Sequence, residues 1–330
     1  MPRVTVNPSG HTFVAEGNDN LLDAALGSGL ALDYGCSNGN CGLCKARLVS
    51  GTVERVRHQD FVLPAAEKST GTILLCANAA RSDLTLEAQV AGGAGDIPRQ
   101  TVAARLKRIA RLGDRVAVLH VQTSRTRRLR FMAGQNAILH WPDGPGVELP
   151  IASCPCDDRN LEFHVRATAR DPFTTRALAD ASRGALLTVQ GPTGTVVLDE
   201  GSQRPVIFLT WDTGFAPVKA LIEHALSTER RPHIALWWLV PANDGPYMHN
   251  LVRSWEDAFD TFHYHPISVG DAPPDRAFEH PQLHRALADD PRWPESDLCA
   301  AGPSAFVRAA RLLATQRGVP GDQWFDTTLK

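Results

Sequence analysis

The segment Gly35-Cys36-Ser37-Asn38-Gly39-Asn40-Cys41-Gly42-Leu43-Cys44 decides the fold of the first part of the chain. It spaces three cysteines as C-x4-C-x2-C, and a fourth follows within Leu74-Leu75-Cys76-Ala77. Four thiolates laid out in this way can hold two irons, with three ligands on one tight loop and the fourth on a distant segment. The glycines allow close turns and aim N–H groups at the sulfur atoms, which offsets negative charge. The spacing predicts a [2Fe–2S] cluster with four ligands, Cys36, Cys41, Cys44 and Cys76.

Two other interpretations of these cysteines are open, a zinc site and four unrelated buried thiols. A zinc site normally uses two short C-x2-C pairs, and the chain has only one. The remaining cysteines are too few and too scattered for a second cluster. We expect them to be buried structural thiols, at Cys154, Cys156 and Cys299.

The composition is that of an ordinary globular protein, with 330 residues, 43% hydrophobic and 21% charged, so two or three domains are expected. The net charge of −2 favours neither a nucleic-acid partner nor an anionic membrane surface. The basic run 125–130 is expected to be a solvated strand edge or loop. Apolar runs such as 206–211 and 234–240 are too short to span a bilayer, and no secretory signal is evident. We therefore expect a cytoplasmic protein.

The pattern of residues divides the chain into three blocks. Residues 1–92 hold short alternating segments around one helical stretch at 21–29. Residues 93–100 continue a glycine-rich stretch that ends near a proline, which is typical of a linker. Residues 101–200 are rich in strand patterns and predict a small antiparallel barrel. Residues 201–330 begin by alternating strand and helix patterns, which predicts a parallel sheet with crossover helices.

Over essentially its whole length the chain resembles the NAD(P)H-dependent flavin/iron–sulfur reductases that begin with a plant-type ferredoxin domain. Those named CDP-6-deoxy-Δ-3,4-glucoseen reductase are the most similar, followed by aromatic-ring dioxygenase reductases. The resemblance rests on six segments, 34–44, 90–98, 191–194, 213–224, 247–249 and 301–303. It implies a multidomain α+β and α/β protein: a β-grasp ferredoxin domain, an antiparallel FAD-binding barrel like that of ferredoxin reductases, and a parallel-sheet nucleotide-binding domain.

The resemblance also implies cofactors, site residues and a partner. NADH delivers two electrons as hydride and the cluster accepts one at a time, so a flavin is needed between them. The FAD-contacting positions that match the family are Arg166, Thr174, Gly191 and Gly194. The matching nucleotide positions are Thr213, Gly214, Pro217, Gly302 and Pro303. The implied partner is a redox protein, namely an oxygenase, a dehydrase or another electron acceptor. No catalytic residue is identified.

Several segments depart from the family pattern, most of them where the flavin should bind and one, Trp211-Asp212, where the nucleotide should bind. Val147–Pro150 stands where the family has R-x-Y-S, and Glu148 would repel a diphosphate. Arg170-Asp171 and Trp211-Asp212 each replace a glycine pair, and Leu329 replaces an aromatic residue that covers the flavin ring. Arg170 could supply the lost phosphate contact from another direction.

The sequence leaves three functions open. The first is an NADH-dependent reductase, with NADH favoured over NADPH because 241–245 lacks an arginine for a 2′-phosphate. The second is a flavin-less electron-transfer or docking protein built on a vestigial reductase scaffold. The third is a zinc-binding structural protein.

Overall fold

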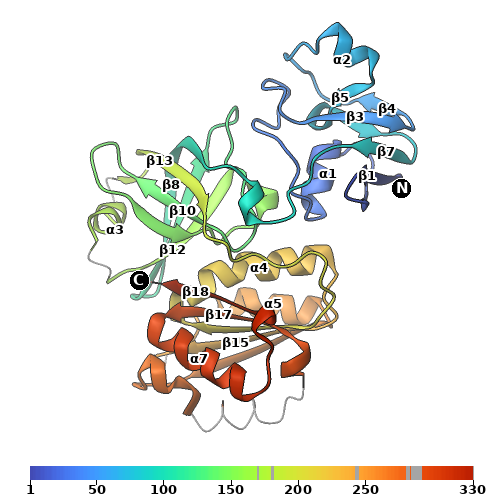
Figure 1. Ribbon diagram of the computed structural model, residues 1–330. Helices are drawn as coiled ribbons and strands as arrows, with labels where there is room; N and C mark the ends of the chain where they lie inside the picture. The colour runs from blue at the N-terminus through green and yellow to red at the C-terminus, as the bar shows by residue number, and fades with distance from the viewer. Residues whose placement is uncertain (169–170, 180–181, 242–244, 280–282, 284–291, 330) are drawn as a thin grey trace.

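The computed structural model describes residues 1–329 except 169–170, 180–181, 242–244, 280–282 and 284–291. The chain forms three main sheets in sequence order, which we call the N-terminal unit, the barrel and the C-terminal unit (Figure 1). Each sheet has its own buried apolar core. The C-terminus lies where the barrel and the C-terminal unit meet.

The N-terminal unit is a mixed sheet with one helix across it. Its strand order is β2-β1-β7-β3-β5, in which β1 and β7 run parallel and the other pairs are antiparallel. The side chain of Asn20 accepts a hydrogen bond from the N–H of Asp23 and so caps the helix. This is the expected β-grasp arrangement. Its elements are β1 (Arg3–Asn7), β2 (His11–Val14), α1 (Leu21–Gly27), β3 (Lys45–Ser50), β4 (Val53–Arg55), α2 (Ala65–Ser69), β5 (Thr72–Leu74), β6 (Asn78–Ala80) and β7 (Leu84–Glu87).

The barrel is a six-stranded antiparallel sheet with the order β11-β10-β13-β8-β9-β12. The N–H of Ala152, just after β11, donates to the carbonyl of Glu162 in β12 at 2.8 Å and nearly closes the sheet. The buried rings of Trp141, Phe163 and Phe173 fill its interior. Its elements are β8 (Gln100–Leu112), β9 (Val116–Thr123), β10 (Asn136–His140), β11 (Val147–Pro150), β12 (Asn160–Arg166), α3 (Pro172–Ala177) and β13 (Leu186–Thr193).

The C-terminal unit is a five-stranded parallel sheet with the order β16-β15-β14-β17-β18. Its central strands are apolar on both faces because α4 covers one face and α7 the other. Phe208 packs toward α4 and Leu209 toward α7. Its elements are β14 (Val206–Trp211), α4 (Phe215–Thr228), β15 (Ile234–Val240), α5 (His249–Ala258), β16 (Phe262–Ser268), β17 (Asp297–Pro303), α7 (Ser304–Gln316) and β18 (Trp324–Leu329).

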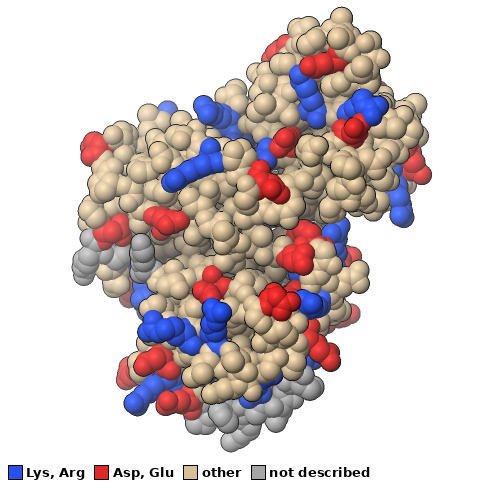
Figure 2. Space-filling model, in the orientation of Figure 1, with Lys and Arg blue, Asp and Glu red and all other residues tan. Residues whose placement is uncertain are grey.

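The fold class predicted from the sequence is confirmed in all three units. On the face shown in Figure 2, acidic and basic side chains are interspersed and neither kind gathers into an extended patch. That distribution agrees with the small net charge of −2. Within the residues that the structure describes, every helix is too short or too polar to cross a membrane.

Candidate functional site

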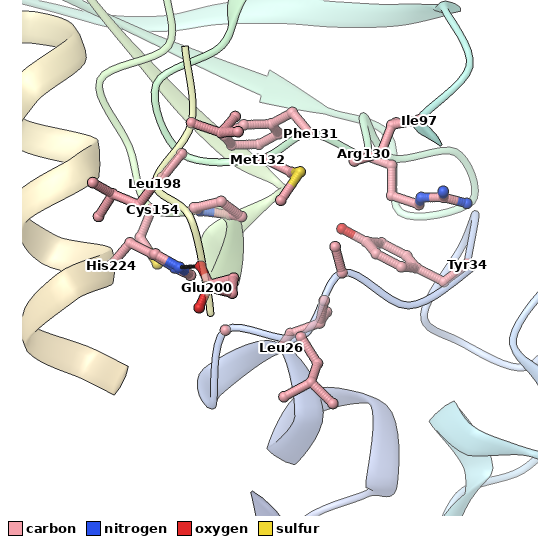
Figure 3. Close-up of a pocket in the computed structure, with 16 residues that line it drawn as sticks. Leu26, Tyr34, Ile97, Arg130, Phe131, Met132, Cys154, Leu198, Glu200 and His224 are labelled. Carbon is pink, nitrogen blue, oxygen red and sulfur yellow. Dashed lines mark hydrogen bonds and ion pairs between the residues drawn. The ribbon is translucent and has the colours of Figure 1, made fainter. Parts of the chain in front are cut away.

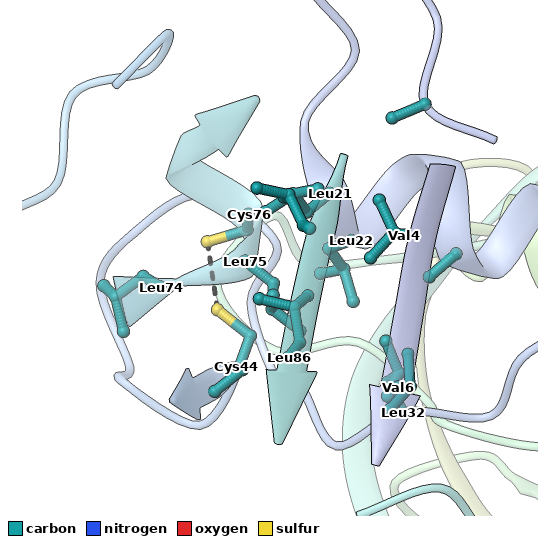
Figure 4. Close-up of a cluster of buried hydrophobic side chains, with 14 of the residues drawn as sticks. Val4, Val6, Leu21, Leu22, Leu32, Cys44, Leu74, Leu75, Cys76 and Leu86 are labelled. Atoms are coloured by element: carbon teal, nitrogen blue, oxygen red, sulfur yellow. Dashed lines mark hydrogen bonds between the residues drawn. The ribbon is translucent and has the colours of Figure 1, made fainter. Parts of the chain in front are cut away.

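The four cysteines of the cluster motif converge at the edge of the N-terminal core in two pairs. The N–H of Cys41 points at Sγ of Cys36 at 3.3 Å, and Sγ of Cys44 lies 3.2 Å from Sγ of Cys76 (Figure 4). Gly39 has a φ of +84°, a conformation that glycine adopts without strain. Two irons with two protein thiolates each require this paired arrangement. The donor set therefore fits a [2Fe–2S] cluster.

A single metal ion would require a different ligand geometry. Throughout the described part of the chain, no three His, Cys, Asp or Glu side chains are arranged to hold one ion. A structural zinc site is closed by four ligands around one centre. The paired thiols therefore favour the cluster over zinc.

The loop that carries the cluster ligands is docked on the barrel. The Tyr34 hydroxyl lies near the Asp158 carboxylate, and the N–H of Arg128 donates to the carbonyl of Gly35 at 2.8 Å. Arg130 forms an ion pair with Asp33. Burial and the nearby Asp158 carboxylate raise the pKa of Tyr34, so its hydroxyl stays protonated. These contacts fix the orientation of the cluster loop relative to the barrel.

The basic run 125–130 was expected to be solvated, and that prediction is wrong for two of its arginines. Leu129 and Phe131 alternate into the barrel core, so Arg128 and Arg130 project the other way, and Arg130 pairs with Asp33 of the N-terminal unit. Arg128 forms an ion pair with the buried Asp158. The sequence signal that was available is the apolar residue after each of these two arginines.

The three units meet around a small apolar cavity (Figure 3). Its volume is about 20 Å³, enough for one water molecule and too small for a cofactor. Its walls come from all three units and include Leu26, Tyr34, Phe131, Met132, Leu198 and His224. We interpret it as a packing junction that holds the N-terminal unit in place.

Two of the predicted buried thiols differ from expectation at this junction. Cys154 is only half-buried, Cys156 is exposed, and the two are joined by a disulfide. Pro155 begins a short 3-10 turn that folds Cys156 back beside Cys154. Cys299 is buried in β17 as expected, and burial raises the pKa of its thiol.

A cleft of about 760 Å³ separates the barrel from the C-terminal unit. This volume lies in the range of cofactor and ligand sites. Residues from β11, β12 and the start of α3 form one wall, and residues at the ends of β14, β17 and β18 form the other. Four of the residues predicted to contact FAD or nucleotide line it: Arg166, Thr174, Thr213 and Pro303.

The other predicted residues stand behind the walls of the cleft. Gly191 lies in β13 opposite Gln100, and Gly194 has a φ of +81° beside Asn136. The last three are buried in the C-terminal unit near the start of α4 or the end of β17, namely Gly214, Pro217 and Gly302.

The charges at the cleft are arranged differently from the expected phosphate site. Glu148 accepts a hydrogen bond from the Thr193 hydroxyl at 2.6 Å. Asp171 caps α3 by accepting from the N–H of Thr174 at 2.8 Å, so its carboxylate takes the helix start where a phosphate could bind. Arg170 lies outside the described residues. The cleft fits a flavin in position, volume and apolar lining, while its described charges are mostly acidic.

The nucleotide would bind at the topological switch point of the parallel sheet. The chain runs from β14 to β15 and β16 on one side, then to β17 and β18 on the other, so a crevice opens at the carboxyl ends of β14 and β17. Thr213 and Gly214 follow β14 and lead into α4, whose first N–H groups favour anions. Gly302 and Pro303 close β17 beside them. The backbone fits a dinucleotide phosphate at this edge.

We expect Gly214→Ala to disturb this edge strongly. A Cβ at position 214 would lie 2.1 Å from the carbonyl oxygen of Ala301, so α4 would have to move away from β17. Overpacking of this kind costs about 2–3 kcal/mol. The measurement is the free energy of unfolding in denaturant. Gly321→Ala is the control, because a Cβ there meets no atom within 4 Å and Gly321, like Gly214, is outside the left-handed region. An equal loss of unfolding free energy in the two variants would contradict the close approach of Gly214 to the Ala301 carbonyl.

A buried polar network joins the two walls beneath the cleft. His164 in β12 contacts Glu162 Oε1 through Nε2 and the Tyr247 hydroxyl through Nδ1, both at 2.7 Å. Burial lowers the pKa of His164, so the ring is neutral. Since the Glu162 carboxylate can only accept, Nε2 carries the proton and Nδ1 accepts from Tyr247. Lys219 in α4 reaches Glu162 at 3.6 Å and the carbonyl of Ala152 at 3.1 Å.

This network makes stability depend on acid pH. Burial alone would raise the pKa of Glu162, but His164 and Lys219 lower it to about 2, below its ordinary 4.5. A carboxyl whose pKa is lowered by folding stabilises the fold at pH values above its pKa in the unfolded chain. We expect Glu162 to contribute on the order of 2 kcal/mol to the free energy of unfolding, and this contribution is lost as the pH falls from about 5 to 2.

The seven tryptophans all lie at or after residue 141, so their fluorescence follows unfolding of the barrel and the C-terminal unit. The Tm difference between the wild type and Glu162→Gln should shrink over this pH interval. A Tm difference that does not change with pH would contradict the lowered pKa of Glu162.

Comparisons with known proteins agree with this geometry. A sequence family described as 2Fe-2S iron-sulfur cluster binding domain matches residues 4–81. The CDP-6-deoxy-L-threo-D-glycero-4-hexulose-3-dehydrase reductase of Yersinia pestis is 30% identical over 325 residues, which cover 98% of this chain and 96% of that protein. Reductase component 2 of the terephthalate 1,2-dioxygenase of Comamonas is 26% identical over 330 residues, with 96% and 94% covered.

Among solved structures, a cytochrome P450 reductase from Amycolatopsis superposes with a TM-score of 0.59 at 22% identity, over 99% of this chain and 98% of that one. That likeness shows the fold. Because the Yersinia protein matches at 30% identity over nearly the full length of both proteins, the chain belongs to the family of CDP-6-deoxy-L-threo-D-glycero-4-hexulose-3-dehydrase reductases and begins with a [2Fe–2S] cluster binding domain.

Proposed function

We propose that this protein takes two electrons from NADH and passes them singly, through FAD and the [2Fe–2S] cluster, to a separate acceptor protein. The observation that carries this proposal is the order of the sites. The nucleotide edge of the parallel sheet faces the cleft, and the barrel that forms the other wall also holds the cluster loop. In this proposal, 1–92 is the ferredoxin domain, 93–100 the linker, 101–200 the flavin barrel and 201–330 the nucleotide domain.

The chain's own residues have separate tasks in this scheme. Cys36 and Cys41 would bind one iron, and Cys44 and Cys76 the other. Bound flavin supplies the step from two-electron to one-electron transfer. Its ring would lie in the cleft, with Thr174 and Arg166 from the barrel wall nearest its phosphates.

On the other wall, the N–H groups near Thr213 and Gly214 would receive the phosphates of NADH, and Gly302 and Pro303 would close over the nicotinamide. Pro241 and Gly245 flank 242–244, which lie outside the described residues, so the preference for NADH over NADPH still rests on the sequence.

The acceptor is proposed from the relatives. The Yersinia relative is named as the reductase of a dehydrase, and the Comamonas relative as the reductase component of a dioxygenase. We propose an acceptor of this class, an oxygenase, a dehydrase or a related protein that needs one-electron delivery. A cytoplasmic location, where NADH is available, belongs to the same proposal.

A second candidate is a flavin-less electron carrier that uses the barrel and the C-terminal unit for docking. The observation that favours it is the acidic character of the cleft, where Glu148 and Asp171 face the space that a diphosphate would occupy. It shares the cluster with the first candidate and differs in the cofactor of the cleft.

The two candidates are separated by cofactor analysis of one sample. Protein purified anaerobically is incubated with FAD and desalted, and its iron, sulfide and flavin are then quantified together. About one flavin for each cluster supports the reductase. A cluster without retained flavin, together with no change of FAD fluorescence on adding the protein, supports the carrier and overturns the reductase.

A further inference from the structure

Asp212 is a buried carboxylate at the point where β14 turns toward α4. Only 5% of the residue is exposed, and its φ of +49° places it in the left-handed region that non-glycine residues rarely enter. The Nε1–H of Trp238 donates to its carbonyl at 3.0 Å and fixes the backbone in this position. The carboxylate is therefore held at the nucleotide edge.

The carboxylate of Asp212 faces two arginines of the barrel. Its Oδ2 lies 3.4 Å from Nη2 of Arg166, and its Oδ1 lies 3.7 Å from Nη2 of Arg115. Oδ1 is buried and makes no hydrogen bond. Arg166 is the only lysine or arginine among the described residues that line the cleft, and its side chain is 44% exposed. The cation best placed for a phosphate is thus already paired with a carboxylate.

The charge of Asp212 also acts on Tyr247, which is outside the lining of the cleft and is hydrogen-bonded to His164. Burial raises the pKa of the Tyr247 hydroxyl, and the Asp212 charge raises it further. This is expected for a charge in a region where water screens poorly. A diphosphate arriving at the start of α4 would have to compete with this carboxylate for Arg166.

We propose that Asp212 is a specificity-determining residue that acts as an internal anion, holding Arg166 and weakening the binding of diphosphate-bearing ligands in the cleft. This inference rests on the proposed function, which places the diphosphates of NADH and FAD there. Binding of a diphosphate requires Arg166 either to leave Asp212 or to pair with both anions at once. The cleft consequently binds its dinucleotides more weakly than its volume and helix start would allow.

The test removes the charge and keeps the shape. Asp212→Asn is nearly isosteric, and asparagine tolerates the left-handed conformation. Dissociation constants are measured on the full chain with its cluster, for NAD⁺ by calorimetry and for FAD by its fluorescence. We expect the Kd of at least one of the two ligands to fall about tenfold. The ligand whose Kd changes identifies the diphosphate that Asp212 faces, and raising the ionic strength should narrow the difference.

The matched control is Asp297→Asn at the opposite, amino end of β17. Asp297 is also buried and also pairs with two arginines, Arg204 and Arg231, but lies away from the cleft. The Asp297→Asn variant should have a less stable fold and an unchanged Kd for both NAD⁺ and FAD. If Asp212→Asn leaves both constants unchanged or raises them while the wild type binds, the inference is overturned and the proposed function stands. If neither the wild type nor Asp212→Asn binds NAD⁺ or FAD, both are overturned.

Discussion

Replacing Cys76 by serine is expected to remove the iron–sulfur cluster. Cys76 is the ligand from the distant segment, fully buried, with its sulfur 3.2 Å from that of Cys44. Serine offers a harder oxygen donor that is protonated near neutral pH, so one iron would be left with a single thiolate from the protein. We expect iron and acid-labile sulfide to fall from about two of each per chain to near zero. The measurement is iron and sulfide content together with the visible spectrum.

The control for Cys76→Ser is Cys299→Ser. Cys299 is also buried, but it lies in β17 of the C-terminal unit and outside the cluster motif. This variant should keep its full content of iron and sulfide. Retention of two irons by Cys76→Ser would show that the fourth ligand is another group.

Arg128→Ala should produce the second large effect, because it leaves the buried carboxylate of Asp158 without its ion-pair partner. Asp158 is almost completely buried and is paired with Arg128, whose side chain is 21% exposed. Breaking a buried pair by removing one partner costs about 3–5 kcal/mol. Asp158 also lies near the Tyr34 hydroxyl, and the N–H of Arg128 donates to the carbonyl of Gly35, so rearrangement here should loosen the cluster loop from the barrel. The measurements are the free energy of unfolding by tryptophan fluorescence and hydrogen exchange around Tyr34.

Arg253→Ala is the control for a lost arginine at an exposed pair. Arg253 reaches Glu256 at 3.9 Å on the surface of α5, and such pairs contribute at most about 1 kcal/mol. We expect no change in exchange at Tyr34 in this variant. An Arg128→Ala protein as stable as Arg253→Ala, with an equally protected cluster loop, would contradict the docking described for Arg128.

The sequence predicted the fold class because two local patterns were strong and a family resemblance covered the first unit. The strand patterns of 101–200 indicated the barrel, and the alternation of strands and helices after residue 201 indicated the parallel sheet. The resemblance carried by the cysteine segment implied the β-grasp unit. The long strand β8 was not picked out individually, since only Val102, Ala104 and Leu106 of its 13 residues are buried and the alternation stops after Leu106. The helix expected at 21–29 ends at Gly27, and Gly29 has a φ of +83°.

The candidate site was predictable by residue type but not by contact. The sequence showed that Asp212 replaces a glycine, and it could not show that Arg115 and Arg166 of the barrel meet its carboxylate. The same limit applies to Arg128 and Arg130, whose partners lie in other parts of the chain. Contacts between units depend on how whole sheets pack, which leaves no periodic trace in a single segment. The ligand and cofactor roles of the site residues remain predictions.

The most direct test of NADH-dependent electron transfer into the cluster is anaerobic addition of NADH to the full chain supplied with FAD, followed by electron paramagnetic resonance. We predict that the signal of a reduced [2Fe–2S] cluster appears and that it requires FAD. A cluster that stays oxidised with excess NADH and FAD, but is reduced by dithionite in the same sample, would contradict it.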